Sequence, residues 1–109
     1  MNDSLTLVSC AQTGKELLSR FRGLKRRKGC NIDNIVVFLA VGVINFNSFK
    51  NRDDWSTPAT IGDVSELLLL PRETARRKLL ELEKDALVKR TSYGFLVADV
   101  PSWSALMSL

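Results

Sequence analysis

The sequence predicts a mainly α-helical fold with a small β-hairpin, and three observations support this prediction. Residues 60–85 have the pattern of a short helix, a tight turn and a longer basic helix. Two short stretches expected to be strands, 87–90 and 95–98, then flank a turn that contains a glycine. Upstream, 13–28 and 32–45 have the pattern of two further helices. This order of elements predicts a winged helix-turn-helix with an extra N-terminal helix, in which the hairpin is the wing.

The length and composition indicate one folded domain. The chain has 109 residues, of which 45% are hydrophobic and 26% charged, enough for a single modest core. Residues 1–12 show no strong period and are expected to form a flexible N-terminal arm, so the domain spans 13–109.

The first predicted helix, 13–28, is basic and amphipathic, and Thr13 is its candidate cap. Gly23 weakens this helix by about 1 kcal/mol relative to alanine, so tertiary or partner contacts are needed. Its apolar face carries Leu17, Leu18, Phe21 and Leu24.

The second helix, 32–45, is apolar almost all round, and Asn31 is its candidate N-cap. Its β-branched residues would also suit a buried strand, but the winged fold needs a first core helix here. So much apolar surface favours a homodimer interface, with complete burial in the monomer as the alternative. The expected interface residues are Val37, Phe38 and Val41, joined by Trp103 and Leu106.

A loop follows at 46–58, rich in Asn, Asp and Ser. We expect its aromatic residues to be anchors rather than stacking platforms for bases; they are Phe46, Phe49 and Trp55. Pro58-Ala59 is expected to add a short strand that pairs with the wing.

The helix at 60–69 begins with a capping box, in which the Thr60 hydroxyl and the Asp63 carboxylate each accept a backbone N–H. Pro71 marks the turn, because it lacks the N–H that a helix interior requires. In the helix at 72–85, one buried stripe is expected to hold Ala75, Leu79 and Leu82.

The wing spans 87–98, and Gly94 can supply a positive φ in its turn. The C-terminal segment, 101–109, is expected to pack its apolar side chains on the core or on a second subunit.

Residues 70–83, Leu-Pro-Arg-Glu-Thr-Ala-Arg-Arg-Lys-Leu-Leu-Glu-Leu-Glu, resemble the recognition helix of the cyclic-AMP receptor class of bacterial regulators. The resemblance covers 57–98 and implies that Arg72, Glu73 and Arg77 read base edges while Thr74 contacts a phosphate. The chain differs from that class at Pro71 (usually Ser), Lys78 (usually apolar) and Ala86 (usually Gly). Too few residues precede the motif for the nucleotide-sensing barrel of that class, so we expect it to be absent.

The charge distribution favours a polyanionic partner. The net charge is only +4, but residues 15–28 hold seven cations against one acid and residues 72–90 hold seven against four. The remainder of the chain sums to −5. Locally concentrated positive charge is typical of a nucleic-acid footprint.

The residue types argue against catalysis, a metal site and a bound cofactor. With no histidine, there is no His-based triad or proton shuttle, and no glycine-rich phosphate loop is present. Cys10 and Cys30 form no metal or nucleophile motif, and a disulfide between them is the less favoured alternative. No signal peptide is apparent, and the apolar run 35–44 is about half the roughly 20 residues of a membrane span, so we expect a cytoplasmic protein.

These observations predict a non-enzymatic, sequence-specific binder of double-stranded DNA, a bacterial transcriptional regulator that acts as a homodimer. Side chains at the N-terminal end of the second helix of the motif are expected to read bases: Arg72, Glu73, Arg76 and Arg77. The expected phosphate contacts are Thr74, Lys78, Lys89, Arg90, Tyr93, Lys25, Arg26, Arg27 and Lys28. The alternatives are a winged-helix protein-interaction module and a basic protein associated with RNA or a membrane surface. The sequence names no operator and no small-molecule effector.

Overall fold

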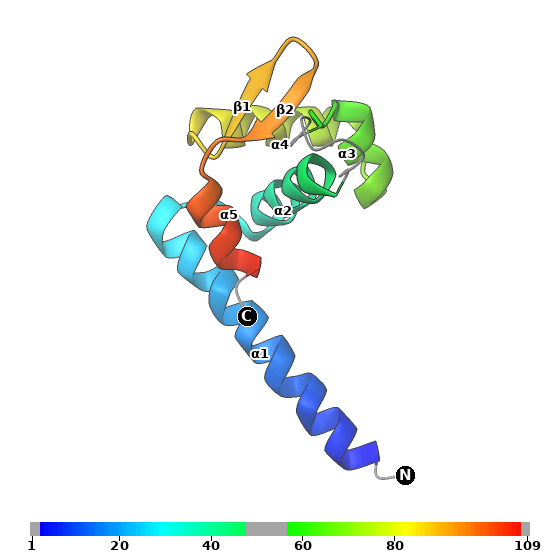
Figure 1. The fold of residues 1–109 in the computed structure, drawn as a ribbon, viewed down its shortest axis with the longest axis vertical. Helices are drawn as coiled ribbons and strands as arrows, with labels where there is room; N and C mark the ends of the chain where they lie inside the picture. The colour runs from blue at the N-terminus through cyan, green and yellow to red at the C-terminus, as the bar shows by residue number, and fades with distance from the viewer. Residues whose placement is uncertain (1–2, 48–56, 108–109) are drawn as a thin grey trace.

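The computed structural model describes residues 3–47 and 57–107, which form five α-helices and one two-stranded antiparallel sheet (Figure 1). The elements are α1 (Asp3–Lys28), α2 (Ile32–Phe46), α3 (Ile61–Leu68), α4 (Arg72–Lys84), β1 (Val88–Thr91), β2 (Gly94–Val97) and α5 (Val100–Met107). The prediction of a mainly helical chain with one small hairpin is therefore confirmed. The expected anchors Phe49 and Trp55 lie outside the described residues.

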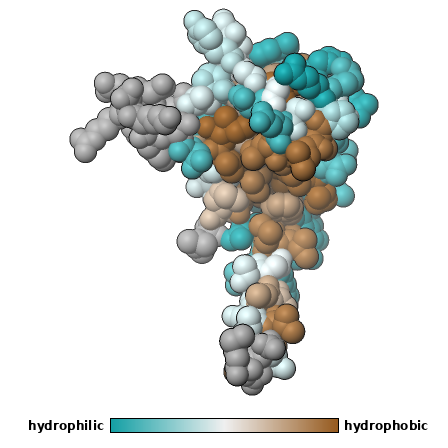
Figure 2. Space-filling view, turned by 90° about the vertical axis from the view of Figure 1, so that its right-hand side faces the viewer, coloured by the Kyte–Doolittle hydropathy of each residue, from teal (hydrophilic) through white to brown (hydrophobic). Residues whose placement is uncertain are grey.

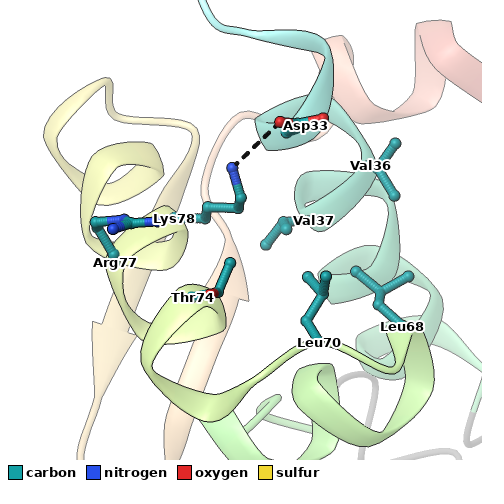
Figure 3. A pocket seen from close by; sticks show the side chains of 8 residues that line it. All are labelled: Asp33, Val36, Val37, Leu68, Leu70, Thr74, Arg77 and Lys78. Atoms are coloured by element: carbon teal, nitrogen blue, oxygen red, sulfur yellow. Dashed lines mark ion pairs between the residues drawn. The ribbon is translucent and has the colours of Figure 1, made fainter.

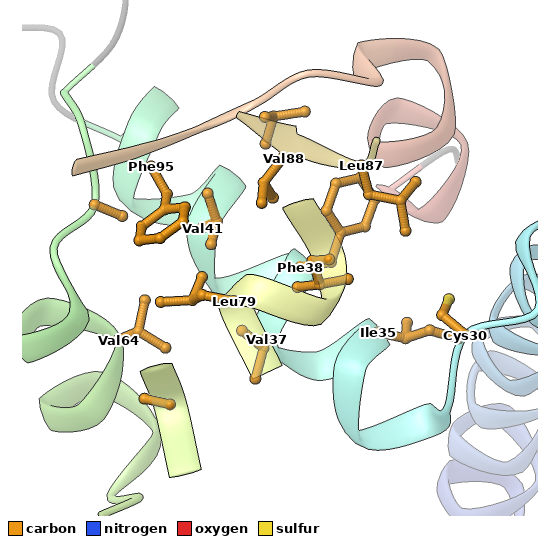
Figure 4. Close-up of a cluster of buried hydrophobic side chains, with 14 of the residues drawn as sticks. Cys30, Ile35, Val37, Phe38, Val41, Val64, Leu79, Leu87, Val88 and Phe95 are labelled. Atoms are coloured by element: carbon orange, nitrogen blue, oxygen red, sulfur yellow. The ribbon is translucent and has the colours of Figure 1, made fainter. Parts of the chain in front are cut away.

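The core is built around α2, which contacts α1, α3, α4, α5 and β2. Because neighbours cover this helix on several sides, most of its apolar side chains are buried in the monomer (Figure 4). The expected dimer interface is therefore wrong at Val37, Phe38 and Val41, whose side chains are fully buried, and at Leu106, which is 1% exposed. Trp103 is half-buried and packs against Phe46, with the ring centroids 5.2 Å apart.

α1 begins ten residues earlier than the sequence predicts. Residues 3–12, expected to be a flexible arm, form its first turns, and Thr13 is not a cap but donates its hydroxyl to the Ser9 carbonyl at 3.2 Å. The C-terminal part of α1 packs on the body through Leu24 and Phe21. Its N-terminal part projects away from the rest of the chain, as the lower half of Figure 1 shows.

The predicted boundaries of α3 and α4 agree with the structure. Asp63 N–H donates to the Thr60 hydroxyl and Thr60 N–H donates to the Asp63 carboxylate, both at 3.0 Å, which completes the capping box. α4 starts at Arg72, directly after Pro71. It ends with Ala86 at φ 61°, and Leu87 N–H donates to the Leu82 carbonyl, the hydrogen bond of a Schellman motif.

The hairpin pairs Val88 with Val97 and Thr91 with Gly94, and Ala59 adds the expected short strand as a single bridge to Phe95. Gly94 has a φ of 143°, and a Cβ there would stand 2.7 Å from the Ala59 carbonyl oxygen. A glycine is required because the backbone of the 59 segment passes so close.

The sequence analysis missed the residue that joins α2 to this hairpin. The Asn45 amide donates to the carbonyls of Thr57 at 2.8 Å and Phe95 at 3.1 Å, and its oxygen accepts from Val97 N–H at 2.8 Å. Asn45 is 1% exposed, so its side chain is a buried link between α2, the 57–59 segment and β2.

α5 is capped at its N-terminal end and contacts α2 through its tryptophan. Asp99 caps it by accepting from Ser102 N–H at 3.1 Å and from the Ser102 hydroxyl at 2.7 Å. The Ser102 hydroxyl first, and Lys28 after it, hold the pKa of Asp99 below its usual value. Further along, the Trp103 indole N–H donates to the Leu39 carbonyl at 3.3 Å.

Replacing Gly42 by alanine is expected to displace Trp103 and destabilise the protein by about 1–3 kcal/mol, the usual cost of overpacking a core. A Cβ on Gly42 would stand 1.9 Å from the Trp103 ring, so the indole has to move. Thermal unfolding and tryptophan emission measure the effect. The control is Gly23→Ala in α1, where the nearest atom is a flexible Arg27 guanidinium at 3.4 Å. A Gly42→Ala variant as stable as the control would contradict this account of α5 docking.

Candidate nucleic-acid interface

α4 presents two different faces. Ala75, Leu79 and Leu82 are fully buried against the core, as their spacing predicts. Arg72, Arg76 and Arg77 lie on the exposed side, in the first two turns of the helix. The N-terminal half of α4 therefore offers guanidinium groups to the solvent from a helix whose other face is anchored.

Glu73 and Arg76 bind each other on that exposed side. The Arg76 guanidinium donates two hydrogen bonds to the Glu73 carboxylate, at 2.9 and 2.6 Å. This bidentate contact lowers the pKa of Glu73 and raises that of Arg76. The two charges offset each other, so this pair adds little net positive potential to the surface.

Arg72 and Arg77 have no ion-pair partner among the described residues, and both are exposed. The Arg72 guanidinium reaches over the start of α3, where a Cβ on Gly62 would stand 2.9 Å from its Nη2 atom. Because Gly62 has no Cβ, the Arg72 guanidinium has room at this position. In Figure 3 the Arg77 side chain points away from α2, toward the outside of α4.

Lys78 was expected to contact a phosphate, but the structure places its side chain elsewhere. Its side chain is 16% exposed and turns toward α2, where its ammonium lies 3.6 Å from the Asp33 carboxylate (Figure 3). Lys78 is therefore not a free cation for a phosphate.

A surface cleft of about 440 Å³ lies between α2, the end of α3 and α4. Thr74, an expected phosphate contact, lines this cleft and is half-buried. The remaining lining residues are Asp33, Val36, Val37, Leu68, Leu70, Arg77 and Lys78 (Figure 3).

The hairpin carries one paired and one unpaired cation. The Arg90 guanidinium donates to the Glu83 carboxylate at 3.0 and 3.3 Å, so Arg90 is already engaged. Lys89 is exposed, and the part of the chain that the structure describes holds no ion-pair partner for it. Tyr93 is also exposed at the turn, where its N–H donates to the Thr91 hydroxyl at 3.2 Å.

The basic end of α1 lies near the C-terminal end of α4 and not beside Arg72 and Arg77, so the phosphates that it could contact are different ones. Gly29, Cys30 and Asn31, which directly follow α1, line a cleft with Glu81, Lys84 and Asp85 at the C-terminal end of α4. Lys28 is bound to Asp99 at 3.1 Å. Lys25, Arg26 and Arg27 are exposed and, within the described ranges, make no ion pair.

Three further features of the described residues bear on metal binding, cysteine chemistry and membrane insertion. No group of three or more His, Cys, Asp or Glu side chains there could hold a metal ion. Cys10 and Cys30 are both free thiols, and burial raises the pKa of Cys30. No single described helix is long and apolar enough to cross a membrane; by length and composition alone the pair α1 and α2 could, but the two are bent by 104°.

Comparison of the chain with models of protein families, with curated proteins and with solved structures gave no significant match. The function must therefore be inferred from the residues of this chain.

Proposed function

We propose that the protein is a transcriptional regulator that binds double-stranded DNA as a homodimer and reads its sequence. In this proposal α2, α3, α4 and the hairpin form a winged helix-turn-helix, and α4 enters the major groove by its N-terminal half. The observation that supports it most is the pair of exposed arginines, Arg72 and Arg77, that lack an ion-pair partner in the described chain on an otherwise anchored helix.

Base reading is assigned to the N-terminal half of α4. Arg72 and Arg77 can each donate two hydrogen bonds to O6 and N7 of a guanine. The Glu73 carboxylate keeps acceptor capacity beyond its bonds to Arg76, so it can accept from N4 of a cytosine while the pair stays formed. Because Arg76 fixes the orientation of Glu73, the two act as one recognition unit.

Phosphate contacts are assigned to the exposed cations of the hairpin and of α1. Lys89 and Tyr93 project from the hairpin, and Lys25, Arg26 and Arg27 project from the end of α1. Arg90 and Lys28 can contribute only by giving up Glu83 and Asp99. The affinity that these groups supply is independent of sequence and falls with salt concentration.

A Lys25→Ala variant is expected to bind DNA with a flatter salt dependence. Each phosphate contact contributes about 0.9 to the slope of log K against log salt concentration, and a homodimer loses two such contacts, so the slope should fall by about two. Titrations of a duplex at several salt concentrations measure it. Lys84→Ala removes the same charge from an exposed position at the C-terminal end of α4 and should leave the slope unchanged. If the wild type and Lys25→Ala had the same salt dependence, Lys25 would not contact a phosphate.

One observation favours a second candidate, a protein-interaction module. Arg76, Lys78 and Arg90 are each paired with a carboxylate, so the positive surface of α4 and the hairpin is smaller than the sequence suggests. Binding assays with duplex DNA, duplex RNA and anionic vesicles separate the classes. Preference for duplex DNA supports the regulator. Preference for RNA or vesicles, or no binding to any of the three at low salt, contradicts it.

A further inference from the structure

The projecting part of α1 carries an apolar stripe that the described body leaves uncovered. Leu7 and Leu18 are each 67% exposed. Together with Ala11 and Gly14 they follow a spacing of four, three and four residues, which places all four on one face of the helix. Figure 2 shows hydrophobic surface on this part of α1, between paler residues.

This face has a shape that suits a second helix. A hollow of about 550 Å³ lies along it, lined by Ala11, Gly14, Lys15, Leu18, Ser19 and Arg22. Residues 11, 14, 15 and 18 have the spacing that forms a hole for a side chain of a facing helix. Apart from its two chain neighbours and the backbone of its own helix, nothing lies within 4 Å of where a Cβ on Gly14 would stand, so this side of the helix is open to close approach.

The stripe is complementary to itself when two copies run antiparallel. In the register that sets Leu7 against Leu18 of a second copy, Ala11 faces Gly14 of that copy. Large side chains then meet large ones at both ends, and small ones meet at the centre. A two-fold axis through the centre generates the same contacts on both chains, as a closed dimer requires.

The distribution of cations along α1 favours antiparallel over parallel pairing of the two helices. No charged residue lies between Ser4 and Gly14, whereas six of the nine residues from Arg20 to Lys28 are cations. Parallel helices would bring the two cationic ends side by side, and antiparallel helices keep them at opposite ends.

The geometry points to self-association: we propose that two copies of the chain pair through antiparallel packing of their Leu7–Leu18 segments. A second copy would also explain why the projecting turns of α1 hold a helix, since an isolated segment of this length is marginal in water. The inference supplies an interface for the homodimer of the proposed function, but it concerns the protein without DNA.

Sedimentation velocity of the full chain without DNA tests the pairing. The wild type is expected to be a dimer, and Leu18→Glu should raise the dissociation constant about thirtyfold or more, the effect of losing a large apolar anchor of the interface. Gly14→Leu should also weaken the dimer, although it improves helix propensity, because it fills the open centre. Leu5→Glu is the matched control: Leu5 is 68% exposed but lies off the stripe, so the dimer should persist.

Disulfide trapping in a Cys10→Ser background tests the direction. A mixture of Leu7→Cys and Leu18→Cys chains should form the mixed disulfide in preference to either symmetric one. A wild type that stays monomeric, equal effects of Leu18→Glu and Leu5→Glu, preferential Leu7→Cys self-linking, or Leu18-dependent binding of the monomer to anionic vesicles would each overturn the proposal. Sequence-specific binding of such a monomer to a DNA half-site would leave the DNA proposal standing.

Discussion

Replacing Asn45 by alanine is expected to lower the free energy of unfolding by about 2–4 kcal/mol. The change removes the acceptor for Val97 N–H and the donor to the Thr57 carbonyl, two groups that the described structure gives no other partner. A buried polar backbone group without a partner costs about 1–3 kcal/mol. The Phe95 carbonyl is less affected, because it also accepts from Ala59 N–H at 2.9 Å.

Urea denaturation of the wild type and of Asn45→Ala measures this loss. The matched control is Asn47→Ala, at an exposed position just after the same helix, which should change stability by less than about 0.5 kcal/mol. If Asn45→Ala were as stable as Asn47→Ala, the buried amide would not be what holds the hairpin against α2. Because the hairpin carries Lys89 and Tyr93, a loosened hairpin is also expected to weaken DNA binding.

Replacing Arg77 by alanine is expected to weaken binding to the preferred DNA site by about 5- to 150-fold for each half-site, the equivalent of 1–3 kcal/mol for each bidentate base contact that is lost. Binding to random duplex should change far less, because the lost hydrogen bonds carry sequence information. The stability of the fold should be unchanged, since Arg77 is exposed and no described residue forms an ion pair with it. Fluorescence anisotropy with both duplexes measures the two affinities.

Two further variants separate base reading by Arg77 from the effect of its charge. Arg77→Lys keeps the charge but loses the planar fork, so it should retain random-duplex affinity and lose discrimination. Lys84→Ala removes one exposed charge at the other end of α4 and should leave discrimination intact. If Arg77→Ala lost the same affinity for the preferred and the random duplex, Arg77 would contact a phosphate and would not read a base.

The features that could be predicted from the sequence depend on neighbours within one or two helical turns. The Thr60–Asp63 capping box, the break at Pro71 and the buried stripe of α4 each follow from residues a few positions apart. The short strand at Ala59 and the positive φ of Gly94 were also predicted, because both have local signatures, whereas the close approach of the Ala59 backbone to Gly94 was not.

The features that were missed depend on contacts between distant parts of the chain. Asn45 joins groups 12 to 52 positions away, and no local pattern distinguishes it from a loop asparagine. Lys78 was counted as a free cation because its partner, Asp33, comes from another helix. The burial of Val37, Phe38 and Val41 required knowing that five elements surround α2.

The helix at residues 3–12 was missed for a related reason. Its turns lack the uninterrupted apolar period expected of a helix that packs on a core, and Thr13 resembled a start signal. The structure continues α1 through this stretch, with apolar side chains such as Leu7 exposed. A self-association face has a narrower stripe than a core face, so it gives a weaker signal in the sequence.

Selection of bound duplexes from a randomised DNA pool tests the central claim most directly. If the N-terminal half of α4 reads bases, the wild type should enrich one sequence containing guanines. Arg77→Ala should relax the selection at one base pair of each half-site and leave the other positions unchanged. No enrichment at low salt, or the same enriched sequence and strength with Arg72 and Arg77 both replaced by alanine, would contradict the claim.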